Sequence, residues 1–338
     1  MSVNLTHDPI NGPGTPNWAT QGVAPGENRY SRQAPSYGRQ FFTNSFSGRR
    51  LGNGMKLATF TQSGRTRIGV VEGDSIADID SEKIPTDMVA LLEGGQPSLD
   101  AVRAAVPAAV RLPLSSVRLE APVLRPRKFL GLGASYASHL KEVAHLMQPP
   151  KHQTWFNKQV TCVNGPYDDI HLPSVSNSLD YEGELAIVIG ARGRNVKGPA
   201  VREMIAGFTV CNDVSVREWQ MRAMTATLGK SFDTHGPLGP WIVTMDELPG
   251  IHNLSLRTWV NGELRQDGST SDLIYRFGEM IEELTTVFTL EPGDVLATGT
   301  PAGVGGARQP PVYLKIGDVV KVEIEGIGHI QNRVVAGP

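Results

Sequence analysis

The chain has 338 residues, with 32 Lys and Arg against 34 Asp and Glu and a formal net charge of −2. This near balance, without a basic stripe, argues against nucleic acid as the main partner. No apolar run approaches the ~18 residues of a membrane helix, so we expect no membrane partner. The 37 glycines and 24 prolines make up about 18% of the chain, against a usual share of roughly 12%. This excess indicates a turn-rich fold dominated by β structure.

Two features bear on the compartment of the protein. Cys162 and Cys211 are too few for a disulfide framework, and they fit a reducing environment. No apolar segment follows Met1, so we predict that there is no secretory signal and that the protein is cytoplasmic.

Residues 1–54 are predicted to be an irregular N-terminal extension, because glycine and proline punctuate them throughout. Aromatic residues such as Trp18, Tyr30 and Phe46 are spaced along this polar segment. Two interpretations stay open: a tail without fixed structure, or an arm that docks on a neighbouring surface through its aromatic side chains.

Residues 55–122 are predicted to form a small α/β domain. Residues 55–74 alternate between apolar and polar around Ser63 and Gly64, a pattern typical of a hairpin. Residues 87–95 and 98–110 have the spacing of two short amphipathic helices, the first of which is stopped by paired glycines.

Residues 123–338 are predicted to form the catalytic domain, which is rich in short strands. The expected strands lie at 125–133, 184–190, 205–213, 239–244, 255–266, 294–300 and 318–328, and the expected helices lie near 200–205 and at 272–288. The predicted fold class is therefore mainly β with α (α+β), with a barrel-like or multi-sheet catalytic domain.

Carboxylates gather at the head of one apolar strand. Glu182 and Glu184 are two residues apart, so their side chains share one face of the strand, and Asp180 is expected to add a third carboxylate there. Asp213 ends a second apolar strand. Like charges are unfavourable together unless a cation neutralises them, and carboxylate oxygens suit Mg²⁺ or Mn²⁺. The alternative is a polar strand end that faces solvent.

His139 and Glu142 have the spacing of neighbours on one helix face. A carboxylate that orients an imidazole makes a general base near neutral pH. A surface pair without function is the alternative, and His145 is a competing histidine. Gly131 and Gly133 do not indicate a dinucleotide site, because the third glycine and the βαβ frame are missing.

Two further segments are candidates for binding an anion. Lys230 precedes the glycine- and proline-rich residues 236–240, which are predicted to form a tight turn, although a surface lysine is the alternative. Thr300 lies in the glycine-rich residues 299–306, whose backbone N–H groups and hydroxyl could receive a substrate carboxylate. A mobile loop is the alternative for this second segment.

Taken in order, these segments resemble the fumarylacetoacetate hydrolase family over residues 55–335, most specifically over 128–305. The resemblance is carried by GLGASYASHLKE, FNK, DYEGELAIVIG, CNDVSVREWQ, GKSFDTHGPLGP, VNGELRQ and TGTPAGVG. It implies a largely β roll, a homodimer and a divalent metal held by Glu182, Glu184 and Asp213. The implied metal is Mg²⁺ or Mn²⁺, with Ca²⁺ as a further candidate.

The resemblance also implies roles for other residues. His139 and Glu142 would activate a water, and Lys230 would stabilise developing negative charge. The substrate side would be lined by Tyr136, Lys158, Arg217, Gln220 and Thr300. One departure is that many relatives have Arg-Asn where this chain has Ala134 and Ser135, which could change how the distal end of the substrate is recognised.

The function implied by the resemblance is a hydrolase that cleaves a C–C bond in a β-diketo 2-oxo acid, such as an acylpyruvate or fumarylpyruvate. The reaction would pass through an enolate held by the metal and would serve the catabolism of aromatic compounds. The alternatives are an oxaloacetate decarboxylase, a 2-hydroxyhepta-2,4-diene-1,7-dioate isomerase and a non-catalytic metal-binding scaffold. The residues alone do not choose among these reactions.

Overall fold

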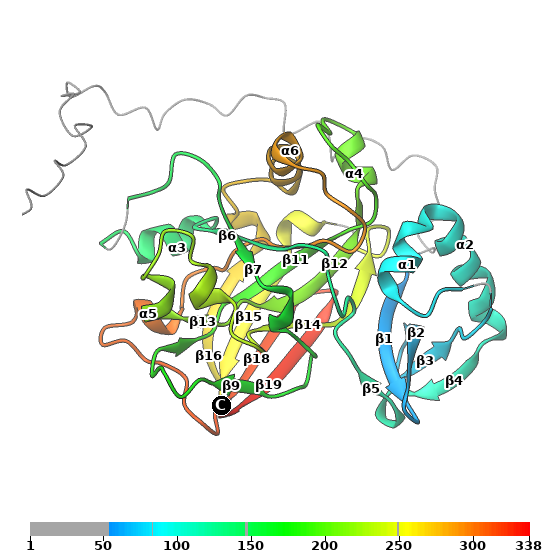
Figure 1. The fold of residues 1–338 in the computed structure, drawn as a ribbon, viewed down its shortest axis with the longest axis horizontal. Helices are drawn as coiled ribbons and strands as arrows, with labels where there is room; N and C mark the ends of the chain where they lie inside the picture. Colours follow the sequence, from blue (N-terminus) through cyan, green and yellow to red (C-terminus); the bar gives the residue numbers. More distant parts are fainter. Residues whose placement is uncertain (1–53, 83, 146–147, 249) are drawn as a thin grey trace, which may run out of the picture. The chain divides into compact units, whose positions relative to one another are not determined.

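The computed structural model describes residues 54–82, 84–145, 148–248 and 250–338 (Figure 1). The predicted extension therefore lies, apart from Gly54, outside the described residues.

Strands dominate the part of the chain that the structure describes. They are β1 (Lys56–Gln62), β2 (Arg65–Glu72), β3 (Ser75–Asp78), β4 (Val110–Pro113), β5 (Arg118–Leu119), β6 (Phe129–Gly133), β7 (Thr154–Lys158), β8 (Val163–Asn164), β9 (Ile170–Leu172), β10 (Leu179–Asp180), β11 (Gly183–Ile189), β12 (Ile205–Asn212), β13 (Ser215–Val216), β14 (Gly236–Thr244), β15 (Ser255–Val260), β16 (Glu263–Ser269), β17 (Val295–Ala297), β18 (Val319–Ile324) and β19 (Gly328–Ala336). The α-helices are α1 (Met88–Glu93), α2 (Gly95–Ala105), α3 (Ala137–Glu142), α4 (Ala200–Glu203), α5 (Arg217–Gln220) and α6 (Phe277–Val287).

The hairpin predicted at residues 55–74 is confirmed. Ser63 and Gly64 have positive φ angles of 51° and 75°, and Gln62 pairs with Arg65 across the turn. Two successive positive φ angles are the mark of a type I′ turn, whose twist matches that of the flanking strands.

One large sheet joins the two predicted folded regions. Its order is β4-β3-β2-β1-β14-β12-β11-β17-β6-β7, so β1 of the N-terminal region pairs directly with β14 of the C-terminal region. The contact includes the pairs Lys56 with Val243 and Leu57 with Ile242. A second sheet has the order β16-β15-β18-β19-β9. Hydrogen bonding therefore continues across the predicted boundary at residue 122.

Strand β11 is buried along its whole length, which explains its unbroken apolar sequence. Leu185, Ile187 and Ile189 belong to a core that includes residues of the five-stranded sheet, such as Val322. The alternate residues Ala186 and Val188 belong to a second core that includes residues of α1 and α2. The predicted α+β class is confirmed, but the large sheet runs open from β4 to β7 in the described residues and does not close into a barrel.

Two predicted segments have different boundaries in the structure. Helix α6 begins at Phe277 rather than near residue 272, because Arg276 caps it and the Glu279 carboxylate accepts from the Arg276 N–H. Residues 236–240 are not a tight turn, since they form the first half of β14 and pair with β8 and β12. Gly239 permits this course because its φ of 141° and its closeness to Pro166 both exclude a side chain.

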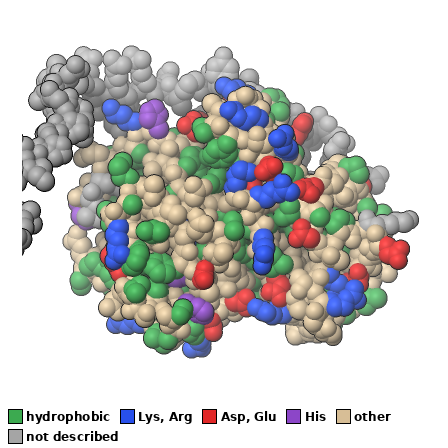
Figure 2. Space-filling view, viewed as in Figure 1, with side chains coloured by type: hydrophobic (Ala, Val, Ile, Leu, Met, Phe, Trp, Pro, Cys, Tyr) green, Lys and Arg blue, Asp and Glu red, His purple; other side chains and the backbone are tan. Residues whose placement is uncertain are grey.

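Charged side chains of both signs are interspersed on the face shown in Figure 2. This distribution agrees with the near-zero net charge of the sequence. None of the helices in the described ranges is long and apolar enough to span a lipid bilayer.

Candidate metal and acid-base centre

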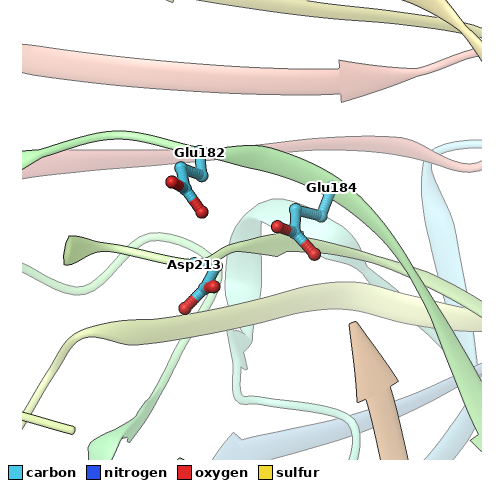
Figure 3. A group of neighbouring side chains, drawn as sticks. All are labelled: Glu182, Glu184 and Asp213. Carbon is cyan, nitrogen blue, oxygen red and sulfur yellow. The ribbon is translucent and has the colours of Figure 1, made fainter. Parts of the chain in front are cut away.

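The three predicted metal ligands come together at the junction of β11 and β12. These strands pair in antiparallel register, with Gly183 opposite Asn212, so the start of one adjoins the end of the other. The Asp213 N–H donates to the Glu182 carbonyl over 2.9 Å, which fixes the two chain segments. One carboxylate oxygen from each of Glu182, Glu184 and Asp213 lies within 4.8 Å of the others, as the converging side chains in Figure 3 illustrate.

Asp180 does not join this group, so its expected place beside Glu182 and Glu184 is wrong. It belongs to β10, and the chain leaves that strand before β11 begins at Gly183. The strict alternation of side chains is lost across this break. The Asp180 carboxylate instead accepts hydrogen bonds from the N–H groups of Gly305 and Gly306, each over 2.8 Å.

Three cationic side chains neutralise the carboxylates of Glu182 and Asp213. Lys230 Nζ donates to Glu182 Oε2 over 2.6 Å and to Asp213 Oδ2 over 2.7 Å. Lys158 Nζ lies 2.6 Å from Asp213 Oδ1, and Arg217 Nη1 lies 2.6 Å from Glu182 Oε1. Every carboxylate oxygen of Glu182 and Asp213 therefore has a cationic partner.

These charges decide the protonation of Glu182 and Lys158. Burial alone would raise the pKa of Glu182, but the charges of Lys230 and Arg217 hold that pKa well below its ordinary value. Burial alone would lower the pKa of Lys158, but the charge of Asp213 raises it above the ordinary value. Lys158 also donates to the carbonyls of Lys230 and His235. All three protons of the Lys158 ammonium are thus donated to the protein itself. Lys158 therefore stabilises the Asp213 carboxylate in this structure, whereas the resemblance to the family implies a place on the substrate side.

Glu184 is the exception among the three carboxylates. Its Oε2 accepts from the Gly299 N–H over 2.7 Å, but no ion pair to Glu184 is formed within the described part of the chain. Burial, together with the negative charges of Asp213 and Glu182, raises the pKa of Glu184 well above its usual value. The cluster is therefore short of positive charge at this carboxylate.

A divalent cation fits this donor set. Three buried carboxylates offer the hard oxygen ligands that Mg²⁺ and Mn²⁺ prefer. The carboxylate without a cationic partner, Glu184, is the one whose charge such an ion would neutralise. The residues that would hold the ion are Glu182, Glu184 and Asp213.

The predicted His–Glu pair forms on the short helix α3. His139 Nδ1 lies 3.0 Å from Glu142 Oε2, and Glu142 Oε1 accepts from the Gly303 N–H over 2.8 Å. A charge on His139 lowers the pKa of Glu182, so the pair and the carboxylate cluster interact electrostatically. The competing His145 is exposed. The backbone of residues 299–303 lies against both groups, since the Gly299 N–H binds Glu184 and the Gly303 N–H binds Glu142.

Tyr136 directly precedes α3 and is fully buried. Its hydroxyl has no hydrogen-bond partner among the described residues, which is rare for a buried polar atom. Burial and the negative charges of Glu184 and Asp272 raise the pKa of Tyr136. The described residues thus leave a buried, unpaired hydroxyl whose pKa is raised by the charge of Glu184, and they do not test the predicted substrate contact of Tyr136.

The other predicted substrate-side residues are bound to the protein itself. Arg217 Nη1 donates to Gln220 Oε1 over 2.9 Å. The Thr300 hydroxyl donates to the Gly183 carbonyl over 2.9 Å and accepts from Gln266 Nε2 over 2.7 Å. The single hydroxyl proton of Thr300 is thus already engaged.

The glycine-rich loop also differs from its predicted use. We define the glycine loop as residues 299–306. Four of its backbone N–H groups donate to carboxylates of the protein rather than standing free for a substrate: Gly299 to Glu184, Gly303 to Glu142, and Gly305 and Gly306 to Asp180.

Two buried or half-buried residues of the centre escape prediction from the sequence. The Gln266 side chain accepts from the Gly183 N–H and donates to the Thr300 hydroxyl and the Pro301 carbonyl. The local sequence pattern around Gln266 indicates a hairpin turn and does not predict these contacts. Asp272 accepts from the Ser138 N–H at the start of α3 over 2.8 Å. No local spacing could reveal this contact, because 134 positions separate its two residues.

Comparison with known families gives two adjoining matches. Residues 128–335 match the family described as fumarylacetoacetate (FAA) hydrolase C-terminal, and residues 55–122 match the family described as Rv2993c-like, N-terminal. The chain is 43% identical over 267 residues to the mitochondrial oxaloacetate tautomerase of Rattus norvegicus, covering 78% of this chain and 85% of the rat protein.

Two solved structures are similar to this one. The fumarylacetoacetate hydrolase from Exiguobacterium antarcticum has a TM-score of 0.75 and 40% identity, covering 84% of this chain and 100% of that one. The maleylpyruvate hydrolase from Sphingobium, solved with manganese(II) and pyruvate, has a TM-score of 0.70 and 34% identity over the same shares.

Proposed function

The chain belongs to the fumarylacetoacetate hydrolase family, and on this premise we propose that it is a divalent-metal-dependent tautomerase that moves a proton at C3 of a 2-oxo dicarboxylic acid. The observation that carries the proposal is the hydrogen-bonded His139–Glu142 pair, which interacts electrostatically with a buried carboxylate cluster. Such a site combines a general base with a place for a cation.

The chemistry requires one proton to leave and one to arrive. In the conversion of enol to keto form, the C2 hydroxyl loses a proton and C3 gains one. With Glu142 ionised, its Oε2 accepts from the N–H at His139 Nδ1, so Nε2 is left to exchange a proton with the substrate. The Lys230 ammonium, fixed between Glu182 and Asp213, adds positive charge to the same site.

A divalent cation held by Glu182, Glu184 and Asp213 would supply a Lewis acid for the carboxylate and 2-oxo oxygen of the substrate. Manganese(II) and pyruvate in the maleylpyruvate hydrolase structure support this metal class and this substrate end. The oxaloacetate tautomerases among the relatives support a second carboxylate on the substrate.

Hydrolysis of a C–C bond is the second candidate, favoured by the similarity to the maleylpyruvate hydrolase. His139 would then take a proton from a water that attacks the C4 carbonyl. The C3–C4 bond breaks, its electron pair goes to C3, and C3 takes up a proton to give a 2-oxo acid and a carboxylic acid. The same base and the same carboxylates serve both reactions.

A substrate panel with Mn²⁺ or Mg²⁺ separates these candidates. We would follow the loss of enol absorbance for enol-oxaloacetate, acetylpyruvate, maleylpyruvate and a hydroxy-dienedioate, after subtracting the uncatalysed rate. Tautomerisation places deuterium from D₂O at C3 without incorporation of ¹⁸O from labelled water into a carboxyl group. Hydrolysis incorporates ¹⁸O, and decarboxylation releases CO₂. Metal-independent rates with every substrate would contradict the proposal.

The assembly and location of the protein are also proposals. We propose a cytoplasmic homodimer, in keeping with the expectation from the sequence. Light scattering on the purified protein and fractionation of the source cells test the two statements.

A further inference from the structure

The glycine loop holds carboxylates that come from three separate elements. Its N–H groups bind Glu184 of the cluster, Glu142 of α3 and Asp180 of β10. The first two belong to the proposed reaction, whereas Asp180 has no part in it so far. Asp180 is nevertheless fully buried. A buried carboxylate is costly unless it is paired, so its contacts indicate what it does.

The contacts of Asp180 are almost all directed at parts of the centre. Oδ1 accepts from the N–H groups of Gly305 over 2.8 Å and Tyr181 over 2.9 Å. Oδ2 accepts from the Gly306 N–H over 2.8 Å and from Arg217 Nε over 2.8 Å. One carboxylate therefore joins the glycine loop to the arginine of α5.

Arg217 carries this connection to the metal cluster. Its Nε donates to Asp180, and its Nη1 donates to Glu182 Oε1 over 2.6 Å. Because a guanidinium group is planar and rigid, fixing Nε on one carboxylate also fixes where Nη1 points. Lys230 holds Glu182 Oε2, and Arg217 holds Oε1. Asp180 does not belong to the cluster itself, but it fixes the guanidinium that holds the second of these oxygens.

We propose that Asp180 is a positioning residue that acts through Arg217 to set the Glu182 carboxylate in place for a divalent cation. This inference rests on the proposed metal-dependent function. In the Asp180→Asn variant, an amide nitrogen would face an N–H donor of Arg217 or of the glycine loop. In either orientation the guanidinium would lose its ion pair with residue 180, and the position of Glu182 Oε1 would be held less firmly.

A purely structural role for Asp180 is the alternative, and Asp294 provides the matched control. Asp294 is equally buried and accepts from the N–H groups of Lys128 and Glu291 and from Lys128 Nζ. It precedes β17, whereas the glycine loop follows that strand. The two aspartates therefore share burial and bonding, but Asp294 precedes β17, whereas Asp180 binds the glycine loop that follows it.

The test measures Mn²⁺ binding by electron paramagnetic resonance without substrate, alongside thermal unfolding of the metal-free protein. We expect Asp180→Asn to raise the Kd for Mn²⁺ by about tenfold or more, as loss of a group that supports a metal ligand does. Asp294→Asn should lower the unfolding temperature similarly but change the Kd by less than about twofold, since distant sites act independently. An unchanged Kd in Asp180→Asn would overturn the inference.

A milder variant keeps the test informative if Asp180→Asn fails to fold. A Cβ at Gly306 would lie 3.2 Å from both Arg217 Nε and Asp180 Oδ2, so Gly306→Ala pushes on their contact without removing a charge. We expect a smaller rise in Kd, of about two- to threefold. Gly278→Ala is its control, because no atom lies within 4 Å of the added carbon. Equal Kd values for Gly306→Ala and wild type would overturn the inference.

A double-mutant cycle tests the route through Arg217. If Asp180 acts through Arg217, then Asp180→Asn should change the Kd little in an Arg217→Gln background. Full additivity of the two effects would contradict that route. If the wild-type protein itself binds no Mn²⁺, the proposed function fails. If wild type binds Mn²⁺ and Asp180→Asn binds it with the same Kd, only the positioning role is refuted.

Discussion

The carboxylate cluster and the His–Glu pair are supported in different ways, although they serve one centre. Glu184 stands on β11, which is buried on both faces, and Glu182 and Asp213 are fixed by three buried or half-buried cations. His139 and Glu142 stand on a helix of six residues, and their side chains are 15% and 19% exposed. One half is held by charge pairs in the core. The other is held by single hydrogen bonds: the Gly303 N–H donates to Glu142, and Asp272 accepts from the Ser138 N–H.

This difference follows from what each half must do. A group of like charges is stable only when the surrounding protein supplies opposite charges in fixed positions. A general base needs one orienting partner and access to substrate. Substitutions in the two halves should therefore have separable effects on metal affinity and on turnover.

The largest effect is expected at Glu184, the carboxylate without a cationic partner. Glu184→Gln should lower metal-dependent turnover by roughly 10²-fold or more, because a metal ligand is lost. It should also stabilise the metal-free protein by about 1 kcal/mol at pH 7. Burial raises the pKa of Glu184, so folding disfavours the ionised form that the unfolded chain adopts freely, and the neutral amide removes this cost. Mn²⁺ titration and thermal unfolding measure the two effects.

The control for this prediction is Glu282→Gln. Glu282 also accepts a glycine N–H, from Gly198 over 2.8 Å, but it is not part of the centre. Its substitution should leave turnover unchanged. If the metal-free Glu184→Gln protein were less stable than wild type, the inference that the unpaired Glu184 carboxyl destabilises the metal-free protein would be wrong.

The second effect concerns the other half of the centre. His139→Ala should lower kcat by about 10²–10⁴-fold, as loss of a general base does, while the Kd for Mn²⁺ stays close to that of wild type. His145→Ala is the matched control, since His145 is exposed and lies near the same helix. If His139→Ala weakened Mn²⁺ binding as much as it slowed turnover, the two halves would not be separable.

A smaller effect is expected at Asp272, which holds the start of α3. Asp272→Ala removes the acceptor of the Ser138 N–H, and loss of such a helix cap costs about 1 kcal/mol of local helix stability. We therefore expect kcat/KM to fall by no more than about fivefold. Steady-state kinetics compare it with Ser271→Ala, a change at the neighbouring exposed position. No change in kcat/KM would show that α3 does not depend on this contact.

The smallest effect on turnover is expected outside both halves, at the Arg67–Asp78 pair of the N-terminal region. The hydrogen bond from Arg67 lowers the pKa of Asp78. Since the folded pKa is the lower one, the pair stabilises the protein at neutral pH, and this contribution is lost as the pH falls below about 4. Asp78→Asn should remove about 1 kcal/mol of unfolding free energy at pH 7 and leave turnover unchanged.

Denaturant unfolding at pH 7 and at pH 3 checks this last prediction. The difference between wild type and Asp78→Asn should shrink at the lower pH. A difference that grows on acidification would mean that the pair does not hold the Asp78 carboxylate in its charged form.

The sequence predicts those features that local pattern determines. The unbroken apolar run of β11 predicts its burial, and the two-residue spacing of Glu182 and Glu184 predicts their shared face. The three-residue spacing of His139 and Glu142 predicts their contact. In each case the residues that matter are near neighbours in the chain, so their geometry follows from one regular element.

The features that the sequence does not predict are contacts between distant segments. Asp180 has the same two-residue spacing from Glu182 as Glu184 has, but it is not part of the carboxylate cluster. It binds the glycine loop, which is 125 residues away in the chain. The engagement of Lys158 by Asp213 likewise spans 55 positions. Spacing rules carry no information about such pairs, because tertiary packing alone brings them together.

The pairing of β1 with β14 has a consequence for how the chain can be divided. The described residues from Gly54 onward belong to one compact unit, and the two family matches meet within it. A chain truncated before residue 123 would leave the second half of β14 without β1, so that the strand around Ile242 and Val243 would become an edge with free hydrogen-bonding groups. Such an edge recruits strands from other molecules, so the isolated C-terminal region should aggregate. The junction between the two family matches is thus not a line along which the folded protein can be cut.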